Sequence, residues 1–196
     1  MLKHVFTEMN AFNSLARQNL KQFDEISKIF QFRNFLEHCQ CKADFLSDHP
    51  YLFNPDGSGC CELLMIKYDI IDLKLSREEE MVFRLNLQEV LLTYLQSSMK
   101  GILTRIENDN LVLLYHGNDV ESITQTRKVL TDTVIKLSEL NAYFAVSEPI
   151  TSAEEILSQY QSCQEIVETS YFFSWKNELI TSSLLSKGMD GDLLAD

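Results

Sequence analysis

The chain has 196 residues, of which 45% are hydrophobic and 23% charged, with a formal net charge of −12. The acidic excess argues against direct nucleic-acid binding, which requires clustered Lys and Arg. No apolar run approaches the roughly 18 residues of a membrane span, and the N-terminus MLKHVFTEMN lacks the apolar core of a secretory signal. The odd number of cysteines predicts free thiols and a cytoplasmic location.

Residues 7–37 contain no Gly or Pro and are predicted to form one long helix. Apolar residues recur along it in alternating steps of three and four, which defines a heptad seam. The seam comprises Met9, Phe12, Ala16, Asn19, Phe23, Ile26 and Phe30, and it weakens at Arg33. Asn19 is a polar residue within the seam, where it can fix the register at some cost in stability. A second apolar face comprises Leu15, Leu20, Ile29, Phe32 and Leu36. The pattern leaves two possibilities open: a dimeric coiled coil, or packing of the helix on its own domain.

Short apolar runs and amphipathic stretches alternate after a Pro- and Gly-containing connector at 47–59. The first predicted elements are a strand at 61–69, a helix from the capping box Ser76-x-x-Glu79 to about 99, and hairpin strands at 102–106 and 111–115. A helix at 118–140 and a strand at 142–146 follow. The last elements are a helix that begins at the capping box Thr151-x-x-Glu154 and ends near 173, and a short strand at 178–180. We expect Gly101 to end the first of these helices, and apolar residues including Met81, Val82 and Leu85 to make that helix broadly buried.

The order over residues 61–147 is β-α-β-β-α-β, which is the order of the ferredoxin-like fold. We therefore predict an α+β domain with an antiparallel sheet on two helices, preceded by a long N-terminal helix. The hairpin and the C-terminal end of the first strand should meet at one edge of the sheet. The predicted domains are a helical or coiled-coil linker at 1–45, a connector at 46–60, the α+β domain at 61–181 and a C-terminal connector at 182–196.

Two motifs in this order resemble those of the GGDEF, or diguanylate cyclase-like, family. Residues 105–111, RIENDNL, stand where that family has R-[LY]-G-G-D-E-F, and residues 69–74, DIIDLK, stand where it has D-[IVL]-D-x-F-K. The chain is more specifically similar to the divergent GGDEF-like middle domains of YesN-type regulators, which end in an AraC-type DNA-binding domain. Their "[VI]-S-x-P-[IV]-x-S-x-E-E-[IL]" segment is matched by residues 146–156, and their helix with aromatic residues at its end by residues 171–173.

The resemblance implies a ligand-binding edge, formed by these two motifs, from which most of the catalytic groups have been lost. The Gly-Gly pair, which lets a backbone approach a nucleotide closely, is replaced by Glu107 and Asn108, and the second Asp of the first motif is Ile71. The inhibitory R-x-x-D motif would need Arg at Ser98 and Asp at Gly101, so it is absent. The vestigial ligand-binding positions that the resemblance implies are Asp69, Lys74, Asp109 and Asn110. We therefore predict that the chain is not an enzyme, has no catalytic residues and needs no cofactor.

Other candidate sites carry weaker patterns. His38, Cys39, Cys41 and His49 are metal-ligand types, but their spacing is irregular for zinc, and no metal site is predicted. The vicinal Cys60 and Cys61 are expected to be thiols, and Cys163 a helix-core residue. The aromatic residues Tyr171, Phe172, Phe173 and Trp175 are interpreted as core packing, with a partner interface as the alternative.

The functional prediction from this reading is a signal-relay and dimerisation domain of an AraC-type response regulator in a two-component system. We expect a homodimer, a flanking receiver or sensor domain and an AraC-type DNA-binding domain, with no nucleic acid or membrane bound by this chain itself. The alternative is a sensor domain that binds GTP or cyclic di-GMP, or a weakly active nucleotidyl cyclase. In that case Asp69 and Asp109 would hold a metal-bound nucleotide at the hairpin edge.

Overall fold

The computed structural model describes residues 26–40, 42–50, 52–53, 60–70, 74–98, 100–106, 110–138 and 141–187. Several predictions lie outside these ranges and stay predictions. They concern the seam residues Met9, Phe12, Ala16, Asn19 and Phe23, the predicted ligand-binding residue Asp109, the motif positions Ile71, Glu107 and Asn108, and Cys41.

A single sheet with the strand order β2-β3-β1-β4-β5 forms the centre of the domain. Its strands are β1 (Cys60–Asp69), β2 (Lys100–Arg105), β3 (Leu111–Gly117), β4 (Asn141–Val146) and β5 (Leu179–Thr181). The pairs β1–β3, β1–β4 and β2–β3 are antiparallel, and β5 adds to β4 in parallel. The α+β fold with an antiparallel ferredoxin-like core is thus confirmed, with one parallel strand added at its edge.

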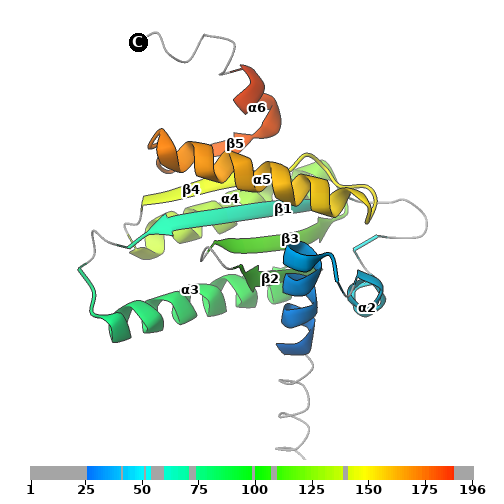
Figure 1. Ribbon diagram of the computed structural model, residues 1–196, viewed down its shortest axis with the longest axis horizontal. Coiled ribbons are helices and arrows are strands. Elements are labelled where there is room, and N and C mark those ends of the chain that lie inside the picture. The colour runs from blue at the N-terminus through cyan, green and yellow to red at the C-terminus, as the bar shows by residue number, and fades with distance from the viewer. Residues whose placement is uncertain are drawn as a thin grey trace, which may run out of the picture.

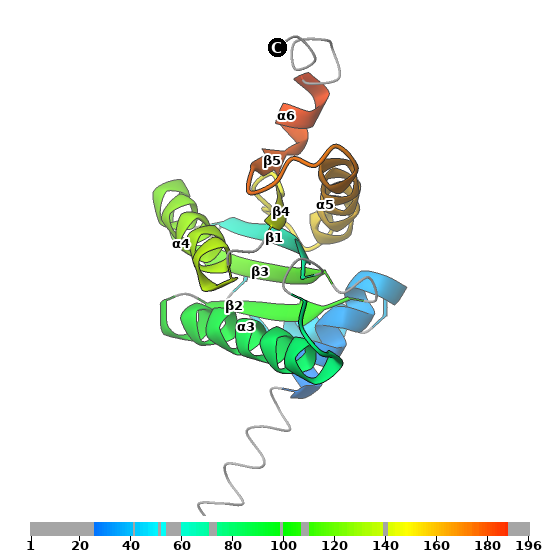
Figure 2. The same cartoon turned by 90° about the vertical axis from the view of Figure 1, so that its left-hand side faces the viewer.

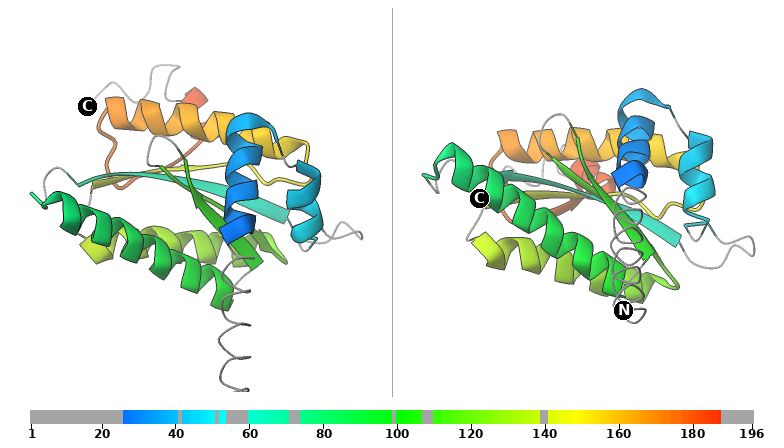
Figure 3. Two further views of the ribbon diagram at one scale, coloured as in Figure 1. Left: turned by 60° about the horizontal axis from the view of Figure 1, so that its bottom comes forward. Right: turned by 90° about the horizontal axis from the view of Figure 1, so that it is seen from below.

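Helices cover both faces of the sheet (Figure 1). The crossover helices α3 (Arg77–Ser98) and α4 (Val120–Ser138) lie on one face, as the β-α-β-β-α-β order predicted. The other face is covered by α5 (Glu155–Phe172), by α2 (Lys42–Asp48) and by the helical residues 26–38. Figures 2 and 3 show the resulting three layers, with the short helix α6 (Ser182–Lys187) following β5.

The helix α3 is less buried than predicted. Its capping box is present, since the Glu79 N–H donates to Ser76 Oγ at 3.3 Å and the Ser76 N–H donates to Glu79 Oε2 at 2.8 Å. The expectation of broad burial is wrong, because Met81, Val82 and Leu85 expose 59%, 52% and 58% of their surface. The helix instead packs on the sheet through a narrower stripe of leucines, which comprises Leu87, Leu91 and Leu95.

Two local predictions about element ends are also corrected. Gly101 does not cap α3 but is the second residue of β2, where a Cβ atom would lie 3.0 Å from Tyr115 Cβ and 3.1 Å from the Leu114 carbonyl oxygen. Before α5, Thr151 pairs with Glu155 rather than Glu154, because the Thr151 N–H donates to Glu155 Oε2 at 2.8 Å. Glu154 forms an ion pair with Lys42 of α2 instead.

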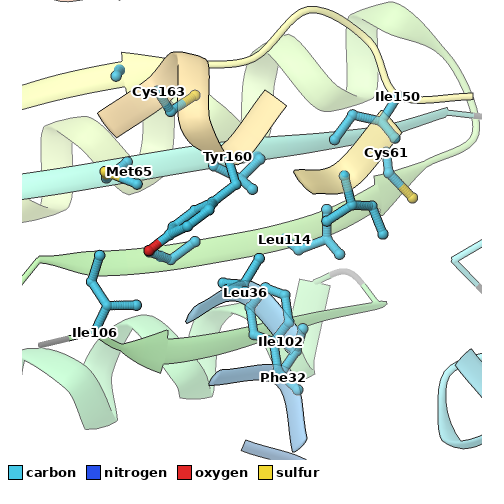
Figure 4. Close-up of a cluster of buried hydrophobic side chains, with 14 of the residues drawn as sticks. Phe32, Leu36, Cys61, Met65, Ile102, Ile106, Leu114, Ile150, Tyr160 and Cys163 are labelled. Carbon is cyan, nitrogen blue, oxygen red and sulfur yellow. The ribbon is translucent and has the colours of Figure 1, made fainter. Parts of the chain in front are cut away.

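The helical residues 26–38 pack on their own domain through one apolar face. Phe32, Phe35 and Leu36 are buried, with exposed fractions of 0%, 1% and 4%. Phe32 and Phe35 both stack on Phe45 of α2, at centroid distances of 5.1 and 5.5 Å. Figure 4 shows Phe32 and Leu36 next to Ile102 of β2. Packing within the chain therefore occurs here, and these residues from the predicted linker contribute to the core of the domain.

Candidate functional site

The strand register places the hairpin base and the C-terminal end of β1 at one edge of the sheet, which we call the rim. Ile66 of β1 and Arg105 of β2 both pair with Leu111 of β3, and Asp69 pairs with Asn141. The Ile106 N–H donates to the Asn110 carbonyl oxygen at 3.1 Å and closes the described part of the hairpin. The predicted proximity of the hairpin to the C-terminal end of the first strand is therefore confirmed.

The candidate residues occupy different environments within the rim. Asp69 is partly exposed at the end of β1, and Lys74 is exposed with a φ of 50°, a left-handed backbone conformation. Asn110 is 2% exposed, and its contact with Met65 places its side chain on the face of the sheet covered by α5. Its Nδ2 makes a long contact of 3.9 Å to Met65 Sδ, and its Oδ1 has no hydrogen-bond partner among the described residues. The side chain of Asn110 thus lies inside the protein below the rim, in a place poorly suited to a charged carboxylate.

Arginine side chains fix the first turns of α3 against β2 beside the rim. Arg105 Nη2 donates to the Arg84 carbonyl oxygen at 3.0 Å. Arg84 in turn forms an ion pair with Glu80, at 2.7 Å, and its guanidinium lies 5.5 Å from the centre of the Tyr68 ring. Sequence reasoning missed this cluster, although Glu80 and Arg84 have the i, i+4 spacing of a helical ion pair. The cluster uses cationic groups near the rim for internal contacts.

A second set of contacts joins the end of β1 to α5 beside the rim. Lys67, which follows Ile66 toward the end of β1, bonds to Glu168 of α5 at 2.9 Å and lies 4.2 Å from the centre of the Tyr171 ring. Tyr171 also packs edge-on against Tyr143 of β4. A charged residue inside a mostly apolar strand is a signal that it has a partner, but the sequence does not identify Glu168 as that partner.

A buried ionic cluster lies at the opposite end of β1. Glu62 is 4% exposed, and it accepts hydrogen bonds from the Tyr115 hydroxyl and from Arg127 Nη1, the latter at 2.8 Å. Burial raises the pKa of Glu62 above its ordinary value, and the bonds from Tyr115 and Arg127 oppose that rise. This cluster lies at the end of β3 away from the hairpin turn, and it joins α4 to the sheet rather than contributing to the rim.

The cysteines and histidines do not form a reactive or metal-binding cluster in the described ranges. Burial raises the pKa of Cys61 to about 12, which leaves its thiol protonated. Cys163 is buried in the core, as predicted. His49 is also buried, with Nδ1 2.8 Å from the Phe45 carbonyl oxygen. Among the described residues, no group of three metal-ligating side chains lies close enough together to hold an ion.

The aromatic residues at the end of α5 are more exposed than the sequence interpretation held. Phe172 and Phe173 expose 81% and 52% of their surface, so core packing is wrong for them. Phe173 stacks on Trp175 at 5.4 Å, and Trp175 is partly buried. The loop that follows includes Ser174 and Asn177 with positive φ values of 59° and 61°. Asn177 is bonded to Ala142 of β4 through its N–H, at 2.7 Å, and its Oδ1, at 3.1 Å.

No protein-family model and no curated protein match the sequence. The structure resembles the coiled coil and GGDEF domain of DgcB from Caulobacter crescentus, solved in complex with c-di-GMP, with a TM-score of 0.52 and 12% identity over 92% of this chain and 99% of that one. An EAL/GGDEF domain protein from M. capsulatus has a TM-score of 0.50 and 16% identity, over 74% of this chain and 97% of that one. A microbial GGDEF domain solved with cyclic di-GMP has a TM-score of 0.50 and 13% identity, over 65% of this chain and 82% of that one.

These similarities show the fold: the chain has the architecture of GGDEF, diguanylate cyclase-like domains. At such low identity they carry over no activity or ligand. Within the described ranges, no helix combines the length and apolarity needed to cross a lipid bilayer.

Proposed function

Because the chain has the GGDEF fold, we propose that it is a non-catalytic signal-relay and dimerisation domain of a bacterial AraC-type response regulator. In this proposal the protein is cytoplasmic, and its receiver or sensor domain and its DNA-binding domain lie outside this chain. The observation that carries the proposal is the two-faced helix at residues 26–38. One face is buried in the domain, whereas Ile26 and Phe30 on the predicted seam each expose 62% of their surface.

Those exposed residues are what a second helix would cover. Ile26 and Phe30 lie one helical turn apart and continue the heptad positions read from the preceding sequence. The buried face supports a relay, because Phe32 contacts α2 through Phe45 and shares one core with Tyr160 of α5. A shift in the register of a helix pair would therefore act on α5, which leads through β5 to the C-terminal exit at α6.

The composition of the rim supports a role without cyclase chemistry. Glu107 and Asn108 add side chains where the resembling family has glycines, and Ile71 supplies no metal ligand. Asn110, a neutral amide, is buried below the rim. Since groups that act together in catalysis lose activity non-additively, this combination is expected to remove the reaction.

A second candidate function is a nucleotide sensor. It is favoured by the end of β1, which carries Asp69 to the same edge as the hairpin, with Lys74 following it. A Mg²⁺-bound nucleotide held at Asp69 and Asp109 would regulate the relay instead of being converted. It would need a binding geometry that tolerates Glu107, whose negative charge opposes a polyphosphate.

The relay proposal is tested by measuring the mass of the full chain by light scattering over a range of concentrations. We expect a dimer, and we expect the double variant Ile26→Asp/Phe30→Asp to be a monomer with unchanged far-ultraviolet circular dichroism. The matched control is Met81→Asp/Leu85→Asp, which places the same charges on the exposed face of α3. A wild-type chain that stays monomeric, or a double variant that keeps the dimer mass, contradicts the proposal.

A further inference from the structure

A cavity of about 310 Å³ lies between the end of the helical residues 26–38, the base of the hairpin and α5. Leu36, Ile106 and Leu157 provide apolar walls from these three parts of the chain. Figure 4 shows Tyr160 extending from α5 across the sheet, with its hydroxyl on the side of Ile106 and Leu36 nearby. The volume is at the lower end of the range of small-molecule pockets, about 300–1,000 Å³.

Polar groups converge on this cavity from the α5 side. Gln161 and Gln164 line it, and Gln164 Nε2 donates to the Tyr160 hydroxyl at 2.9 Å. That bond orients the carboxamide of Gln164 and leaves its oxygen as an acceptor beside the remaining N–H. A carboxamide presents a donor and an acceptor side by side, so it pairs well with a planar molecule that carries the complementary edge.

The charges around the cavity limit what it can hold. Glu37 lines it, and this carboxylate is paired with Arg33 at 2.8 Å. None of the described lining residues is Lys or Arg, and the one described lining residue that can carry a positive charge is His38, which is exposed. A phosphate or carboxylate ligand would therefore find no lysine or arginine among the described lining residues to pair with, in a chain whose net charge is −12. An uncharged ligand avoids this cost.

We propose that this cavity binds an uncharged planar molecule with adjacent hydrogen-bond donor and acceptor groups, of the class of free nucleobases and aromatic amides. Its faces contact the apolar walls, and its polar edge pairs with Gln164. Such a molecule joins the end of the N-terminal helix to α5 and stabilises the docked helix. The regulatory consequence rests on the proposed relay function, whereas the binding site itself does not.

The test is calorimetric titration of the full chain with adenine and nicotinamide as neutral probes and adenosine monophosphate as the anionic one. We expect saturable binding of at least one neutral probe with a Kd below about 1 mM, and binding of the monophosphate at least about tenfold weaker. Leu157→Trp, which fills the cavity, and Gln164→Ala, which removes the paired edge, should each weaken binding about tenfold or more. The matched control is Gln125→Ala on the exposed face of α4, which should bind as the wild type does.

The proposal is overturned if neither neutral probe binds saturably, if the monophosphate binds more tightly, or if both cavity variants bind as the wild type does. Circular dichroism confirms that the compared variants are folded, and Gln164→Ala changes a partly exposed side chain. Light scattering separates this site from the relay. A chain that binds adenine but stays monomeric contradicts the proposed function and supports the site, whereas a dimer that binds neither neutral probe does the reverse.

Discussion

Phe30 and Phe32 lie on the same turn of one helix, yet Phe30 exposes 62% of its surface and Phe32 exposes 0%. Phe32 stacks on Phe45 with the rings inclined by 17°. We expect Phe32→Ala to lower the free energy of unfolding by about 3–5 kcal/mol, because it removes a fully buried aromatic ring. The same change at Phe30 should cost less than about 0.5 kcal/mol in the monomer. Urea unfolding followed by circular dichroism at low protein concentration measures both, and equal losses would contradict the assignment of the two faces.

The buried carboxyl of Glu62 is expected to make the free energy of unfolding depend on pH. Its pKa is higher in the folded chain than in the unfolded chain, because burial outweighs the bonds from Tyr115 and Arg127. The folded state therefore holds this proton more tightly, and stability is lost as pH rises from about 4.5, the ordinary pKa of this carboxyl, through the raised pKa. We expect the free energy of unfolding of the wild type, minus that of Glu62→Gln, to decrease over this interval in urea titrations at fixed pH values.

Glu79 supplies a control with the opposite sign. Its pKa is lowered, first by the bond from the Ser76 backbone N–H, so its contribution is present above its ordinary pKa and is lost as pH falls. The difference between the wild type and Glu79→Gln should therefore increase with pH. If both differences change in the same direction, the buried cluster at Glu62 is not responsible for the effect.

The buried amide of Asn110 predicts that this position tolerates an apolar residue better than an acidic one. Since Oδ1 lacks a partner among the described residues, Asn110→Leu removes an unsatisfied polar atom and should leave stability unchanged or raise it by about 1 kcal/mol. Asn110→Glu restores the residue type of the resembling family but buries a charge, and should lower stability by about 2 kcal/mol or more. Thermal unfolding of both variants, compared with that of the wild type, tests these two expectations. A stable Asn110→Glu protein would mean that the side chain turns outward.

The nucleotide-sensor alternative is decided by titrating GTP and cyclic di-GMP in the presence of Mg²⁺. If the chain is a relay without a ligand at the rim, we expect no binding with a Kd below about 1 mM. Tight binding that Asp69→Ala weakens would favour the sensor. Tight binding that Asp69→Ala leaves unchanged would place the nucleotide elsewhere on the protein. The matched control is Glu121→Ala in the first turn of α4, which removes one exposed carboxylate near the end of the sheet opposite the rim.

The local patterns predicted the elements and their order, because strand length, helical periodicity and capping residues are short-range properties. They did not predict which face of α3 is buried, since apolar residues surround that helix and periodicity alone could not choose between Leu85 and Leu87. The rim was placed correctly from the order of the strands. Its internal contacts, such as Arg105 with Arg84, join positions far apart in the sequence and became visible only in the fold.

The three-residue strand β5 has a consequence for how the domain can be cut or fused. It pairs in parallel with β4, whose sequence NAYFAV is apolar and has few charges to deter pairing with another chain. Truncation before Leu179 would bare that edge and provide a template for aggregation. Expression fragments that end inside the loop after α5 should therefore precipitate, whereas fragments that retain residues 179–187 should remain in solution.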